Sequence, residues 1–158
     1  MLTKYQKKIN PGLPIEIAEI QSRTFVRVAK EKDAPLALIV AISQYETGQT
    51  FNPMSLNKQS GASGAMQLLS CKEPFDQNRL FDIGYNIEKG WDCLEEKLTA
   101  NDNDLSQSLG DYSGGAKWYV DGIYATYAKV NIYLTMPKFR VSDPKLVVVK
   151  KGKTKRST

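Results

Sequence analysis

Histidine is absent from this sequence of 158 residues. The absence excludes catalytic triads and dyads that depend on histidine, zinc sites with histidine ligands, and the side chain that most often moves protons near neutral pH. Any proton transfer in this protein must therefore use Glu, Asp, Lys, Tyr or Cys.

Cysteine is scarce, with only Cys71 and Cys93 in the chain. Two thiols are too few for a four-thiolate zinc site and too few for a disulfide framework. We favour two buried thiols, because a free cysteine packs as a small apolar side chain. A single bridge between Cys71 and Cys93 is the alternative.

Long hydrophobic runs are also missing. The longest uncharged stretch in the apolar first half covers residues 34–45, well short of the ~20 residues that cross a bilayer. The N-terminal segment MLTKYQKKINPG has lysines but no apolar core and no small-residue cleavage pattern, so we expect no secretory signal and another route of delivery. A chain of this length suits one globular domain.

Basic charge is concentrated at the C-terminus. Of the 22 basic and 17 acidic residues, eight basic and one acidic lie within residues 138–158, which gives this segment a charge of +7. Residues 1–137 hold the other 14 basic and 16 acidic residues, so a nucleic-acid-binding face on the domain is disfavoured. We interpret 1–137 as the domain and 138–158 as a solvated, disordered tail, with polyanions such as RNA, anionic lipid or teichoic acid as alternative partners of the tail.

The first half predicts two helices, a long loop and a third, short helix. Mixed helical spacing of apolar residues after Pro14 predicts an amphipathic helix over 15–32. Asp33 is expected to cap a second helix, which is apolar on all sides and therefore central in the domain, and which ends near Glu46. Residues 49–64 are rich in Asn, Pro, Ser and Gly and predict a loop, after which residues 65–70 are expected to restart a short helix.

The second half predicts three further helices. Ile87, Trp91, Leu94 and Leu98 form a one-sided stripe that predicts a helix ending near Asn101, with Trp91 in the core. A short helix opened by Asp104 or Ser106 and running to Leu109 is expected next. Glycines at 114–115 then precede a long helix over 117–135, on which Val120, Ile123, Tyr124 and Tyr127 share a face and which Pro137 ends. Only 147–149 looks like a strand, so we predict a mainly α domain with little or no sheet.

Glu46 stands out because it ends an uncharged apolar helix. Poor solvation and the negative end of the helix dipole both disfavour the carboxylate, and both raise its pKa. A carboxyl group that is protonated at neutral pH can act as a general acid on a poor leaving group such as a glycosidic oxygen. A glutamate at a helix end is usually only a solvated terminus, so the segment that follows decides the interpretation.

Residues 37–69, ALIVAISQYETGQTFNPMSLNKQSGASGAMQLL, resemble the catalytic segment of the soluble lytic transglycosylases. That segment has a helix-terminal Glu, then Ser, an aromatic-Asn-Pro and a later Gly-Ala-x-Gly-x-Met-Gln. The matching positions are Glu46, Phe51, Asn52, Pro53, Gly61, Ala62, Gly64, Met66 and Gln67. Thr47 replaces the usual Ser, and the interval to Phe51 is about two residues longer than in the commonest bacterial form. The longer interval is similar to a variant found in phage virion and tail enzymes.

Two later blocks extend the resemblance. The sequence LFDIGYNIEKG is similar to the family's Asn-Ile-x-x-Gly helix, and GDYSGG is similar to its Ala-Tyr-Asn-x-Gly turn, with Tyr112 and Gly115 in the matching places. Asp111 and Ser113 depart from this turn, and Asp111 is expected either to tune Tyr112 or to cap a turn. The matched blocks lie within roughly residues 34–130, about three fifths of the chain.

The resemblance implies a lysozyme-like fold that degrades bacterial peptidoglycan. Glu46 would act alone as acid and base at the bond between N-acetylmuramic acid and N-acetylglucosamine, with the substrate's own 2-acetamido group stabilising the positive charge. The product is a 1,6-anhydro sugar if the C6 hydroxyl attacks, and a reducing end if water attacks. Gln67 and Tyr112 would orient the sugar or the acid, while Met66 and Ser63 would line the cleft. No metal or organic cofactor is implied.

Two other functions stay open. The first is an enzyme that cuts the peptide cross-links of peptidoglycan. Against it, the chain lacks the histidine of ordinary zinc and cysteine peptidases and the duplicated Asp-Thr/Ser-Gly signature of aspartic enzymes. A wall-binding or assembly module without activity is the second alternative, although Glu46 argues against it. We expect a phage-encoded monomer that acts in the virion or is released to the host periplasm and cell wall, with other virion proteins as further partners.

Overall fold

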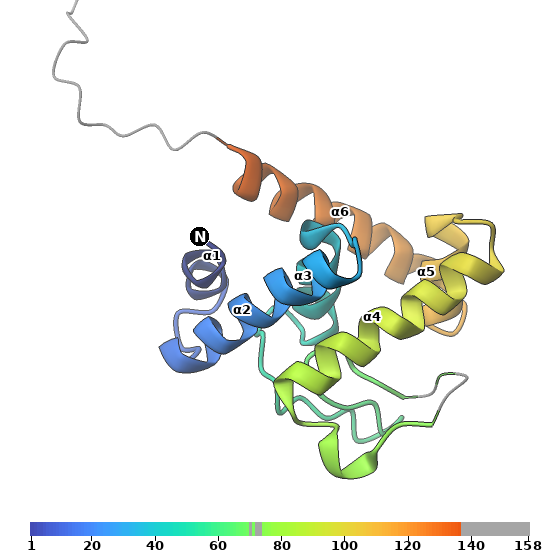
Figure 1. Cartoon of the computed structure of the whole chain (residues 1–158), viewed down its shortest axis with the longest axis horizontal. Helices are drawn as coiled ribbons and strands as arrows, with labels where there is room; N and C mark the ends of the chain where they lie inside the picture. Colours follow the sequence, from blue (N-terminus) through green and yellow to red (C-terminus); the bar gives the residue numbers. More distant parts are fainter. Residues whose placement is uncertain (70, 72–73, 137–158) are drawn as a thin grey trace, which may run out of the picture.

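The computed structural model describes residues 1–69, 71 and 74–136 (Figure 1). These residues form the helices α1 (Leu2–Ile9), α2 (Ile15–Glu31), α3 (Leu36–Glu46), α4 (Ile83–Ala100), α5 (Leu105–Tyr112) and α6 (Lys117–Thr135), with a 3-10 turn, η1 (Gln77–Arg79). Within the described part, β structure is limited to two isolated bridges, between Leu56 and Ser63 and between Ser63 and Leu68. The prediction of a mainly α domain is therefore confirmed. The basic tail at 138–158 and the strand-like residues 147–149 lie outside the described residues.

Helix α3 lies at the centre of the domain, packed on α2, α4 and most extensively on α6 (Figure 1). All eight residues from 37 to 44 are buried, and those from Ile39 to Ile42 are fully enclosed. A helix that is apolar on every side is stable only when it is surrounded in this way. In the described residues, no helix combines the length and apolarity needed to cross a bilayer.

The boundaries of α2 and α3 follow the sequence closely, with one correction. Helix α2 begins after Pro14 and α3 ends at Glu46, as predicted. The predicted cap at Asp33 is wrong, because Pro35 occupies the N-cap and Asp33 lies in a turn with a φ of 49°. The residue before a proline is disfavoured in the helical region, which keeps Ala34 out of the helix and separates Asp33 from its first turn.

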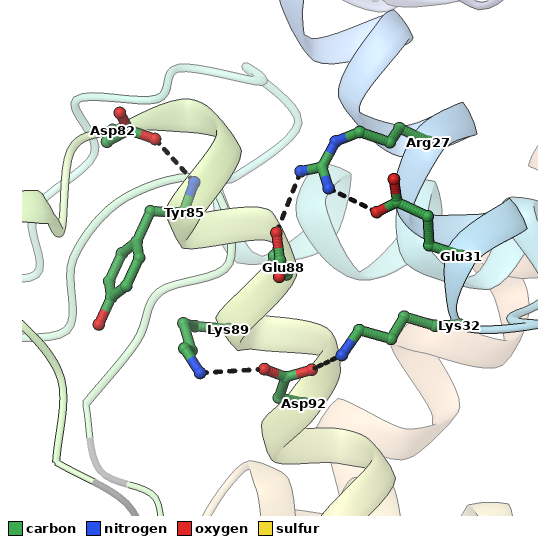
Figure 2. Close-up of polar contacts among 8 residues, drawn as sticks. All are labelled: Arg27, Glu31, Lys32, Asp82, Tyr85, Glu88, Lys89 and Asp92. Carbon is green, nitrogen blue, oxygen red and sulfur yellow. Dashed lines mark hydrogen bonds and ion pairs between the residues drawn. The ribbon is translucent and has the colours of Figure 1, made fainter.

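The later helices also form where the sequence predicts them. Helix α4 starts before the apolar stripe, because the Asp82 side chain accepts a hydrogen bond from the backbone N–H of Tyr85 (Figure 2). Asp104 caps α5 in the same way through Gln107, and this helix continues past Leu109 to Tyr112. The side chain of Trp91 is 4% exposed and belongs to the core. Helix α1 was not among the predicted elements.

Residues 65–69 do not restart a helix, which corrects the prediction for the sequence AMQLLS. Gly64 and Gln67 have φ values of 82° and 48°, both in the left-handed region. Ser63 and Leu68 exchange two backbone hydrogen bonds of 2.9 and 3.0 Å around the turn between them. A tight turn, and not a helix face, buries Ala65, Met66 and Leu68, whereas Leu69 is exposed. Ser70 lies outside the described residues.

Ion pairs border the contact between α2 and α4 (Figure 2). The Arg27 guanidinium lies 2.6 Å from the Glu31 carboxylate and 3.1 Å from that of Glu88, and Lys32 lies 2.8 Å from Asp92. Such exposed pairs contribute little stability individually, about 0–1 kcal/mol each. The packing of the two helices therefore depends on the apolar core more than on these pairs.

The two cysteines form a disulfide, which corrects the expectation of two buried thiols. Cys71 and Cys93 are 22 residues apart in sequence, and their Cα atoms are 5.7 Å apart. The bond joins the long loop before η1 to the middle of α4. Cys93 is buried against the core, as expected, but the fold brings Cys71 directly against it.

Candidate active site

A cleft of about 450 Å³ opens between the loop that joins α3 to α4 and the connection between α5 and α6. The disulfide and part of α4 also line it. The lining mixes polar and aromatic side chains with backbone, and comprises Glu46, Asn57, Ser60, Ala62, Gln67, Leu68, Leu69, Cys71, Phe75, Cys93, Lys97, Asp111, Tyr112, Ser113, Gly114, Ala116, Trp118 and Tyr119. The cleft therefore collects residues that are far apart in the chain.

Glu46 reaches this cleft from the last turn of α3. Its carboxyl group is half-buried, and the Tyr119 hydroxyl donates a hydrogen bond of 2.5 Å to its Oε1. Burial raises the pKa of Glu46 to about 7, against the opposing effect of the bond from Tyr119. The group thus holds its proton near neutrality and still releases it readily, which is what acid and base catalysis by one side chain requires.

The chain leaves Glu46 through a loop that Thr47 holds in place. The Thr47 side chain is buried, donates a hydrogen bond of 2.8 Å to the Ser43 carbonyl and accepts one of 2.8 Å from the Phe51 N–H. Phe51 is fully buried with a φ of 53°, and Gln21 donates to its carbonyl at 2.9 Å. The loop that follows Glu46 is therefore anchored to α3 through Thr47 and to α2 through Gln21.

Two of the sequence blocks, GASGAMQ and NIEKG, pack together as one structural unit. The Asn86 side chain accepts a hydrogen bond from the Met66 N–H at 2.7 Å and donates to the carbonyls of Ser63 at 3.0 Å and Leu80 at 2.7 Å. A Cβ atom on Gly90 would lie 2.5 Å from the Met66 Cβ, and one on Gly64 would lie 2.1 Å from the Asn86 amide nitrogen. Both glycines are thus needed for the close approach of loop and helix.

Gln67 lines the cleft, as its predicted role requires. Its side-chain nitrogen donates to the backbone carbonyls of Ser55 at 3.0 Å and Gly64 at 2.9 Å. These two bonds brace the wall of the cleft. The side chain therefore supports the shape of the loop as well as facing the cleft.

Tyr112 also lines the cleft, at the end of α5. Its hydroxyl donates a hydrogen bond of 3.0 Å to the Met66 carbonyl, and burial raises its pKa well above the usual value. Its ring stacks on that of Tyr119, with centroids 6.4 Å apart and planes inclined by 26°. Tyr112 therefore contacts both the loop, through the Met66 carbonyl, and Tyr119, through its ring. Tyr119 itself makes the hydrogen bond to Glu46.

Met66 and Ser63 lie behind the cleft wall, contrary to the expectation that they line it. Met66 is fully buried against Gly90, and Ser63 is 3% exposed with its hydroxyl bonded to the Gly61 carbonyl at 2.9 Å. The left-handed turn at Gly64 and Gln67 points Met66 into the core and Gln67 outward. Asp111, also at the cleft, accepts a hydrogen bond of 2.8 Å from Asn101 and neither caps a turn nor bonds to Tyr112.

Sequence reasoning did not identify Tyr119 or Trp118. Tyr119 lies one turn before Ile123 on the buried face of α6, together with Thr126 and Val130. That spacing was available in the sequence, but it predicts only a core position. Trp118 precedes Tyr119 in the sequence but is not buried: it lines the cleft and is 69% exposed.

The described residues hold no group of three His, Cys, Asp or Glu side chains arranged to bind a metal ion. No protein-family model, curated protein or solved structure matches this chain. The relation to the soluble lytic transglycosylases therefore stays a prediction from the sequence motifs.

Proposed function

We propose that this protein cleaves the glycan strands of bacterial peptidoglycan, at the β-1,4 bond between N-acetylmuramic acid and N-acetylglucosamine. The observation that carries the proposal is Glu46, a carboxylic acid with a pKa of about 7, held by Tyr119 in an open cleft. The motif resemblance supplies the substrate class. A lysozyme-like arrangement of the helices is part of the same proposal.

The chemistry needs one acidic residue. Protonated Glu46 donates its proton to the glycosidic oxygen as the bond to the anomeric carbon breaks, and the 2-acetamido oxygen of the same sugar stabilises the developing positive charge. The Glu46 carboxylate then takes the proton from the attacking hydroxyl, which restores the acid. Attack by the C6 hydroxyl gives a 1,6-anhydro end, and attack by water gives a reducing end.

The biological setting is part of the proposal and rests on the sequence. The long interval between Glu46 and Phe51 is similar to that of phage virion enzymes, and we place the protein in that setting, acting on the host wall during infection or lysis. Its partners are then peptidoglycan and other virion proteins.

Mass spectrometry of the fragments released from purified peptidoglycan tests this function. The unsubstituted protein is compared with Glu46→Gln, which keeps the size of the side chain and its capacity to accept the Tyr119 bond but has no acidic proton. We expect glycan fragments from the first protein and none from the variant.

The fragment ends distinguish the possible reactions. Ends of 1,6-anhydro-N-acetylmuramic acid identify transglycosylation, and reducing ends identify hydrolysis. Severed peptides on intact glycan strands, or equal release by both proteins, would contradict the assignment to Glu46. Binding without any cleavage would indicate a wall-binding module.

A further inference from the structure

Trp118 exposes more of its surface than any other large apolar side chain in the described part of the chain, at 69%. It lies in the first turn of α6 and lines the cleft beside Glu46. A single exposed apolar side chain on a protein surface needs no explanation. An indole left in water within the same cleft as a carboxylic acid of raised pKa is a candidate for ligand contact.

Two aromatic rings lie beside the indole of Trp118. Its centroid lies 6.4 Å from that of Tyr45, with planes inclined by 36°, and 6.4 Å from that of Tyr119, with planes inclined by 73°. The Tyr119 ring thus contacts Trp118, while its hydroxyl holds Glu46. The Tyr119 side chain therefore links the indole to the acid, and the indole lies beside Tyr119 with most of its surface exposed.

The chemistry of the cleft suits a pyranose ring. In a β-1,4-linked N-acetylhexosamine the large substituents are equatorial, so both faces of the ring present axial C–H groups and are apolar. A flat aromatic ring packs on such a face, while polar groups meet the hydroxyl and acetamido groups at the edge of the sugar. Asn57, Ser60, Lys97 and Asp111 provide polar groups around the same cleft.

We infer that Trp118 is the stacking platform for one N-acetylhexosamine ring of the strand, next to the ring whose bond Glu46 breaks. This inference rests on the proposed function and adds the place where the glycan is held. It makes binding depend on the sugar and not on the peptide attached to it.

Intrinsic fluorescence offers a direct test, because the chain has two tryptophans and Trp91 is buried at 4% exposure. The probe is soluble glycan strand of peptidoglycan from which all peptides have been removed, titrated into the Glu46→Gln protein. We expect a shift of the emission that persists in Trp91→Phe and is lost in Trp118→Phe, and a dissociation constant at least tenfold higher in Trp118→Ala.

Tyr124→Ala is the matched control, since Tyr124 is 40% exposed on the same helix and does not line the cleft. Its dissociation constant should not change. Equal affinity in Trp118→Ala and its parent would overturn the inference, and so would a lack of glycan-strand binding by folded Glu46→Gln. The proposed function is tested separately. It fails if the unsubstituted protein releases no glycan fragments from peptidoglycan.

Discussion

The hydroxyl of Tyr119 donates a hydrogen bond of 2.5 Å to Oε1 of Glu46, across 73 residues of sequence. The bond joins the end of α3 to the start of α6, the two helices that pack most extensively on each other. It orients the carboxyl group in the cleft and partly offsets the effect of burial on its pKa. Tyr119 therefore acts as a positioning residue for Glu46.

Tyr119→Phe should move the pH profile of activity. Without the hydroxyl, the ionised form of Glu46 loses its donor, so its pKa rises above about 7. A hydrogen bond to a charged group contributes about 1.5–3 kcal/mol, which corresponds to a rise of about one to two pKa units. The alkaline limb of the rate against pH should shift upward by that amount, with a lower maximum rate.

Tyr124→Phe is the control for this experiment, because it removes an exposed hydroxyl from the same helix outside the cleft. Its pH profile should coincide with that of the parent. An unshifted alkaline limb in Tyr119→Phe would show that the bond does not tune Glu46, even if the rate falls.

Glu46→Gln should change how stability depends on pH. The folded pKa of about 7 lies above the usual 4.5, so the native state holds the proton more tightly than the unfolded chain between these values. The resulting stabilisation is complete below pH 4.5 and is lost as the pH rises through 7. Each pKa unit corresponds to about 1.4 kcal/mol, so the loss is roughly 3 kcal/mol.

Urea unfolding at pH 4.5, 6 and 8 measures this effect. The decline in the free energy of unfolding should be smaller in Glu46→Gln by about that amount, and no histidine titrates in the same range. Equal declines in both proteins would mean that Glu46 is not perturbed.

Gly90→Ala should destabilise the fold, because the new Cβ would lie 2.5 Å from the Cβ of Met66. Loop and helix would have to separate, at a cost of the order of 1–3 kcal/mol, and the turn that carries Gln67 would move with them. Gly110→Ala is the matched control, since a Cβ there meets nothing within 4 Å and alanine favours the helix by up to about 1 kcal/mol. Thermal unfolding should show a lower midpoint for the first variant and an equal or higher one for the second.

Reduction of the disulfide should lower stability without unfolding the core. The bond closes a loop over 22 residues of sequence separation, for which the chain-entropy model gives about 3 kcal/mol. Thermal unfolding with and without a reducing agent measures the contribution of the disulfide. The double variant Cys71→Ser/Cys93→Ser should unfold at the same temperature as the reduced protein, and the reducing agent should not change that temperature. An oxidised protein that unfolds at the same temperature as this variant would contradict the expected contribution.

The helices and the acid were accessible from the sequence because their signals are local. An apolar run ending in Glu46 predicts a buried helix with a carboxyl group at its end, and both the boundary and the raised pKa are found in the structure. The predicted cap at Asp104 depends only on a residue three positions further along, and the similar cap at Asp82 was not predicted. The turn after Gly64 was not predicted, because the mostly apolar sequence AMQLLS is compatible with either a helix or a tight turn.

The cleft depends on pairings that no local pattern contains. The sequence by itself determined that a carboxyl group with a raised pKa ends the central helix, and that histidine chemistry is excluded. Only the tertiary structure decided that Tyr119 supports Glu46, that Tyr112 bonds to the Met66 carbonyl, and that Cys71 meets Cys93. These contacts span from 22 to 73 residues. They form because the helices and the long loop bury their apolar side chains in one common core, which fixes where residues distant in the sequence can meet.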